Sequence, residues 1–81
     1  MKISGYSDKG LRIDEIVSVE LAEVTLSVTP DEARKVAAFL LHAAAEMERM
    51  ETSYGHMHLA DKQPGFDQSP HLTVFNSELE G

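Results

Sequence analysis

The stretch from Thr29 to Glu51 constrains the fold of this chain more than any other part of its sequence. It reads TPDEARKVAAFLLHAAAEMERME, is rich in Ala, Leu, Met, Glu and Arg, which favour helices, and has no Gly or Pro beyond its first turn. Thr29 suits the N-cap, Pro30 suits the first helical position, and Glu32 stands where it completes a capping box. The sequence therefore predicts a helix over residues 30 to 51.

Apolar residues recur in this helix at three- and four-residue spacing, which places them in one stripe. We expect the stripe to pack on a sheet. Two interpretations remain for the other apolar positions, Phe39, Leu41 and Ala43: a wide core face, or a second surface offered to another chain. The predicted stripe consists of Ala33, Val36, Ala37, Leu40, Ala44 and Met47.

Two strands are predicted before the helix. The first covers residues 2 to 6. The second begins at Ile16 and runs to Val28, but its apolar alternation slips by one residue near Ala22. Because side chains alternate between the faces of a strand, an uninterrupted strand cannot keep both apolar sets on one face. A β-bulge near Ala22 restores the phase, whereas a tight hairpin would need turn residues that the sequence LAEV lacks.

Two further strands are predicted after the helix. The segment GHMHLA, from Gly55, alternates Met57 and Leu59 with two histidines, and HLTVFN covers residues 71 to 76. The segment between them, residues 61 to 70, concentrates Asp, Pro, Gly and Ser and is typical of a surface loop. The tail, residues 77 to 81, is expected to fray.

This order of elements predicts an α+β fold, a single small domain over residues 1 to 81. We expect a mostly antiparallel four-stranded sheet in ββαββ order, with the one long helix packed on one face. One helix covers one face, so the other face of the sheet is a natural binding surface. A chain of 81 residues has a thin core, which makes a homodimer a reasonable expectation.

The charge balance limits the partners that this chain can bind. Fourteen acidic and seven basic residues give a formal charge of −7, which disfavours nucleic acids and anionic membranes and favours a basic partner. Without cysteine there is neither a disulfide framework nor a thiolate metal site. No signal-peptide pattern and no apolar run near the ~20 residues of a membrane span is present, so we expect a cytoplasmic protein.

The histidine pair in YGHMHLAD, residues 54 to 61, allows a metal-binding interpretation. On a strand, His56 and His58 project from the same side about 6 to 7 Å apart, and Asp61 or His71 could supply a third ligand. The alternative is that both imidazoles belong to the polar face of a strand. No nucleophile elbow or phosphate-binding loop is present, so the sequence predicts no catalytic residue.

Several segments together resemble a known family. They are LAEVTLSVTPDEARKVAAFLLHAAAEME, YGHMHLAD, PGF and SPHLTVFN, within about residues 21 to 76. This succession is similar to immunity protein family thirty-two of bacterial polymorphic toxin systems. One departure concerns the loop before the last strand, where the family is expected to have an aromatic residue, commonly tryptophan, and this chain has Phe66.

The resemblance implies a non-enzymatic protein, without a cofactor, that binds and neutralises a cognate toxin, which the charge balance predicts to be basic. Under this hypothesis a recognition patch consists of Tyr54, His56, His58, Asp61 and Phe66. Two alternatives remain open: a small metal-binding protein that uses His56, His58 and Asp61, and a homo-oligomeric structural module.

Overall fold

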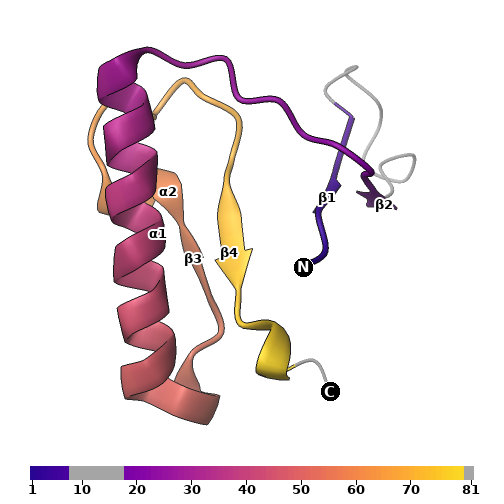
Figure 1. Ribbon diagram of the computed structural model, residues 1–81, viewed down its shortest axis with the longest axis vertical. Coiled ribbons are helices and arrows are strands. Elements are labelled where there is room, and N and C mark those ends of the chain that lie inside the picture. The colour runs from indigo at the N-terminus through magenta and orange to yellow at the C-terminus, as the bar shows by residue number, and fades with distance from the viewer. Residues whose placement is uncertain (8–17, 80–81) are drawn as a thin grey trace.

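The structure is a computed structural model that describes residues 1–7 and 18–79. Its longest described element is helix α1, Pro30–Met50. A hairpin of two strands lies beside this helix, and a second pair of strands lies farther from it (Figure 1). The described elements, in chain order, are β1 (Ser4–Gly5), β2 (Val19–Glu20), α1, a 3-10 turn (Glu51–Ser53), β3 (His56–His58), α2 (Leu59–Lys62), β4 (Thr73–Phe75) and a second 3-10 turn (Ser77–Leu79).

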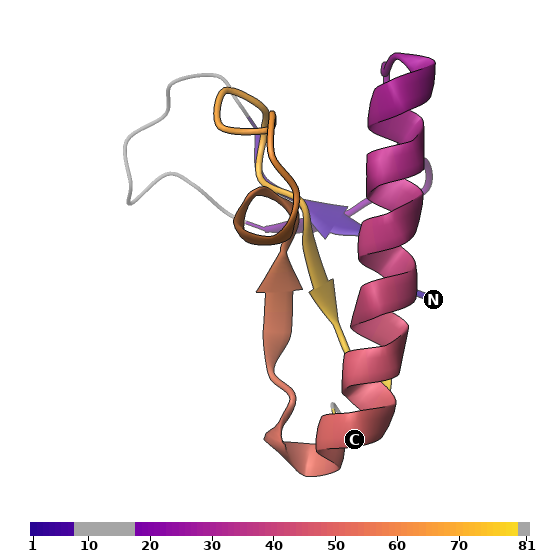
Figure 2. The ribbon, with the colours of Figure 1, turned by 90° about the vertical axis from the view of Figure 1, so that its left-hand side faces the viewer.

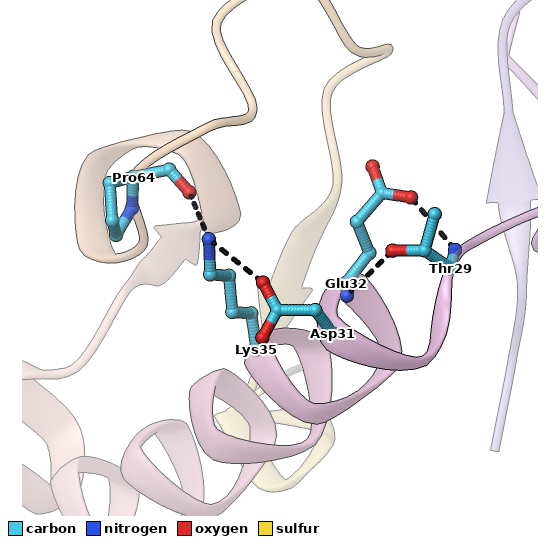
Figure 3. A network of polar contacts seen from close by, with 5 residues as sticks. All are labelled: Thr29, Asp31, Glu32, Lys35 and Pro64. Carbon is cyan, nitrogen blue, oxygen red and sulfur yellow. Dashed lines mark hydrogen bonds and ion pairs between the residues drawn. The ribbon is translucent and has the colours of Figure 1, made fainter.

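The start of α1 confirms the predicted capping box, which Figure 3 shows from close by. The Glu32 backbone N–H donates to Thr29 Oγ1 at 3.1 Å, and the Thr29 N–H donates to Glu32 Oε1 at 2.8 Å. Two N–H groups that the helix itself leaves without partners are satisfied in this way. The helix begins at the predicted residue and ends one residue before the predicted end.

The chain leaves α1 through Glu51, whose backbone has φ 49° and ψ −121°. Its N–H still bonds to the Met47 carbonyl, and a 3-10 turn then leads to Tyr54. A positive φ is unfavourable for a side chain with a Cβ atom, so this exit from the helix stores backbone strain.

The hairpin of β3 and β4 forms the sheet that packs on α1. The strands are antiparallel, with Met57 opposite Val74, and the Leu59 N–H bonds to the Leu72 carbonyl at 2.9 Å just beyond the ladder. These strands are shorter than the sequence predicts. A single helical turn, α2, begins at Leu59, where the end of a strand and the start of a loop were expected. Figure 2 shows the hairpin beside α1, with α2 at the end of β3.

The predicted four-stranded sheet is wrong, although the α+β class is confirmed. Strands β1 and β2 pair with each other and form a separate two-stranded sheet. The predicted strand over residues 2 to 6 is reduced to Ser4–Gly5, and the predicted bulged strand over residues 16 to 28 is reduced to Val19–Glu20; residues 16 and 17 lie outside the described part. A bend occurs at Ala22, and residues 23 to 29 are extended without a described neighbouring strand, so no ladder forms there (Figure 1).

The core lies between α1 and the β3–β4 hairpin. The predicted helix stripe is largely wrong, because Leu40 is 47% exposed and Ala33, Ala37 and Ala44 are exposed as well. The inward arc of α1 is turned by about 70° from the predicted one, at 3.6 residues per turn. This arc buries Phe39, whereas half of the predicted arc consisted of alanines. The buried residues are Val36, Phe39, Ala43, Tyr54, Met57, Leu59 and Phe66, with Met47 and Met50 packed against them.

The predicted loop before β4 is held against the first turns of α1. Lys35 Nζ lies 3.4 Å from the Asp31 carboxylate and donates to the Pro64 carbonyl at 3.5 Å (Figure 3). Gly65 adopts φ 92°, a conformation that favours glycine, and Phe66 then enters the core. The loop therefore contributes a core residue as well as a surface turn.

The end of the described chain is a 3-10 turn, Ser77–Leu79, where fraying was expected. The Glu78 N–H donates to Asn76 Oδ1 at 3.0 Å, which closes this turn. The rest of the predicted frayed tail, residues 80 and 81, lies outside the described part. Among the described helices, none combines the length and apolar character that crossing a membrane requires.

Candidate functional site

The face of the β3–β4 hairpin that points away from the core carries the candidate site. Alternation along β3 buries Met57 and leaves His56 exposed and His58 half-buried. The register places His56 opposite Phe75 and His58 opposite Thr73, and opposite residues share one face of a sheet. We call this the open face, and define it by His56, His58, His71, Thr73 and Phe75.

The rings of the open face contact one another. The ring centroids of His56 and His58 are 4.9 Å apart, in an edge-to-face arrangement at 88°. The His56 ring is also 5.1 Å from that of Phe75, tilted by 35°. His71 extends the group, since its ring centroid lies 6.4 Å from that of His58. Phe75 is 59% exposed, so the group presents an aromatic side chain to solvent.

A hydrogen bond fixes the orientation of His58. Its Nδ1 atom and Thr73 Oγ1 lie 2.9 Å apart across the two strands. The hydroxyl donates when Nδ1 carries no proton and accepts when it does, so the bond persists in either tautomer.

The structure places two members of the sequence-predicted recognition patch in the core. Tyr54 is 3% exposed and Phe66 is 6% exposed, so neither can anchor a partner at the surface. The Tyr54 hydroxyl donates to the Val74 carbonyl at 3.0 Å, and burial raises the pKa of this phenol. The prediction that these two aromatic residues form surface contacts is therefore wrong, because the hairpin and loop need them to fill the space against α1.

The other three predicted patch residues lie outside the core. His56 and His58 belong to the open face, and Asp61 is exposed on α2, the helical turn that follows β3. Within residues 1–7 and 18–79, no group of three or more His, Asp or Glu side chains is close enough to hold a metal ion. The structure therefore does not bring His56, His58 and Asp61 together as the three ligands of the metal-binding alternative.

A groove of about 280 Å³ lies between the C-terminal half of α1 and strand β3. Its volume is just below the range of about 300 to 1,000 Å³ that is typical of small-molecule pockets, and the groove is open to solvent. The hydrogen bond from Arg49 lowers the pKa of Glu46, so the groove carries a carboxylate. The residues that line it include His42, Glu46, Met50, His56, His58 and Lys62.

Sequence reasoning missed Phe75 and Thr73 as site residues. The signal was present, since Leu72 and Val74 alternate with them in HLTVFN and an apolar pair of this kind favours the core side. What the sequence did not contain was the register that sets Phe75 opposite His56.

No protein-family model, no curated protein and no solved structure matches this chain.

Proposed function

We propose that this chain is an immunity protein, which binds a toxin made beside it and blocks that toxin through the open face. The observation that carries this proposal is the exposed Phe75 in contact with the His56 ring on the surface of a hairpin. Aromatic side chains are enriched in protein–protein interfaces and supply much of their binding energy. A rigid ring also loses little conformational freedom when a partner covers it.

The electrostatics of the chain support a basic partner. The formal charge is −7, and two exposed carboxylates adjoin the elements of the open face: Asp61 follows β3 and Glu78 follows β4. Such charges speed the encounter with a cationic protein and discriminate against acidic ones. A toxin that acts on nucleic acid would have the basic surface that this arrangement suits.

The immunity role itself follows from the resemblance of residues 21 to 76 to immunity protein family thirty-two. The site is compatible with it, because the open face presents the exposed Phe75 and the nearby groove is too small and open to enclose a drug-sized ligand. A protein that acts by covering its target needs a surface of this kind and no reaction centre.

The test is co-expression with the product of the gene immediately upstream in a bacterial host that this product kills. We expect the wild-type chain to restore growth and Phe75→Ala to weaken the complex by about 2 kcal/mol, or about 30-fold in Kd, as hot-spot residues do. Leu41→Ala is the matched control, because Leu41 is 74% exposed on α1 and lies outside the open face.

Two results would contradict the proposal. If the wild-type chain does not relieve the toxicity of the adjacent gene product, the immunity role is wrong. If it relieves toxicity and Phe75→Ala binds the toxin as tightly as the wild type does, the open face is not the surface that binds. Circular dichroism of both variants establishes that their folds are intact.

A further inference from the structure

A strand-like segment before α1 has no neighbouring strand in the part of the chain that the structure describes. In residues 22 to 28, AEVTLSV, every second side chain is apolar, and Val24, Leu26 and Val28 are 51%, 53% and 43% exposed. Within residues 1–7 and 18–79, the backbone of this segment forms no hydrogen bond to another backbone group. The preceding residue, Leu21, makes the last such bond, from its N–H to the Ile3 carbonyl at 2.7 Å.

The hairpin offers the edge that such a segment requires. In the described part of the chain, β4 pairs with β3 on one side and has no partner strand on the other. Val74 in this strand and Leu72 just before it are half-buried and packed against the core. A strand added at this edge would continue both the ladder and the apolar layer on α1.

We propose that two copies of this chain exchange these segments, so that residues 22 to 28 of each copy pair with the β4 edge of the other. Val24, Leu26 and Val28 then extend the apolar layer that Leu72 and Val74 begin. The sheet of four strands that the sequence predicts is completed between two molecules, with β3 and β4 from one copy and the strands before α1 from its partner.

A second copy is the occupant because each copy carries both halves of the contact. Exchange is reciprocal under two-fold symmetry, so it buries the segment and the β4 edge twice and closes the contact between two copies. Figure 1 shows the segment running from β2 to the start of α1, apart from β4 of its own chain. The open face is a different surface, so a toxin can bind it in the dimer.

The test is sedimentation equilibrium of the full chain over a range of concentrations. We expect twice the 8.9 kDa mass of the chain, and a dissociation constant raised at least tenfold by Leu26→Lys, because the charge would lie in the apolar layer. Leu41→Lys is the matched control, an exposed leucine outside the contact, and should leave the dimer intact.

A second measurement does not depend on variants. In a mixture of isotopically labelled and unlabelled wild-type chains, we expect intermolecular nuclear Overhauser effects between residues 24 to 28 of one copy and Leu72 or Val74 of the other. A monomer at high concentration would overturn the proposal, and protected amides in residues 24 to 28 would then place the segment on β4 of its own chain. A dimer without these contacts, or one that Leu26→Lys leaves unchanged, would overturn it too.

Discussion

Replacement of Phe39 by alanine tests which side of α1 faces the core. Phe39 is the one large side chain in the described part that is fully buried, with 0% exposed. Removing a buried phenylalanine ring costs about 3 to 5 kcal/mol, from lost transfer free energy and the cavity left behind. An 81-residue domain has a free energy of unfolding of about 4 to 12 kcal/mol, so Phe39→Ala removes a large part of it.

The matched control is Leu41→Ala, two residues along the same helix. Leu41 is 74% exposed, so its truncation should change the free energy of unfolding by no more than about 0.5 kcal/mol. Phe39→Leu provides a graded variant if Phe39→Ala does not fold, with an expected loss of about 1 to 2 kcal/mol.

The assay is urea unfolding followed by far-ultraviolet circular dichroism, which reports α1. With a slope near 1 kcal/mol per molar urea, typical of a small domain, the midpoint for Phe39→Ala should fall by about 3 M or more. The slope of the Leu41→Ala transition should match that of the wild type. Equal losses in Leu41→Ala and Phe39→Ala, or a loss below about 1 kcal/mol in Phe39→Ala, would show that the described core is wrong.

Three further predictions concern single contacts. Thr29→Ala removes the capping box and should lower the free energy of unfolding by about 1 kcal/mol, whereas Thr29→Ser should retain most of it, both measured by urea unfolding. Glu51→Gly should raise it by about 0.5 to 1 kcal/mol, because glycine adopts the positive φ without strain; a destabilised variant would contradict this. Because burial raises the pKa of Tyr54, the folded state holds this proton more tightly than the unfolded state does. The stabilisation that protonated Tyr54 gives the folded state is therefore complete below the unfolded pKa of about 10 and is lost as the pH rises through the folded pKa. The urea midpoint of the wild type should fall over this pH range, and Tyr54→Phe should remove that fall.

The helix could be predicted from sequence because its determinants are local. Thr29, Pro30 and Glu32 lie within four residues of one another, and the capping box that they imply forms as expected. The inward arc could not be chosen by spacing alone, since apolar residues cover most of the helix surface. Burial of the large Phe39 ring rather than small alanines decides which arc faces the hairpin.

The sheet was harder to predict because strand pairing depends on distant contacts. Alternation correctly placed Met57 inward and the two histidines outward on β3. Alternation in residues 22 to 28 is as regular, yet this segment has no described partner strand. Alternation indicates a strand, but it does not indicate which sheet edge the strand pairs with.

The candidate site shows the same division. His56 and His58 could be assigned to one face from their spacing, but the position of Phe75 beside His56 depends on the register of the hairpin. Tyr54 and Phe66 were predicted at the surface because aromatic side chains often anchor protein–protein contacts. Their burial follows from the paths of the 3-10 turn and of the loop through Gly65, which sequence patterns do not specify.

The most direct test of the proposed function is a nuclear magnetic resonance titration of the isotopically labelled chain with the purified product of the upstream gene. We expect stoichiometric binding, with the largest amide shifts at His56, Thr73 and Phe75 and little change around Leu41. Absence of binding at stoichiometric concentrations, or shifts confined to the outer side of α1, would contradict it.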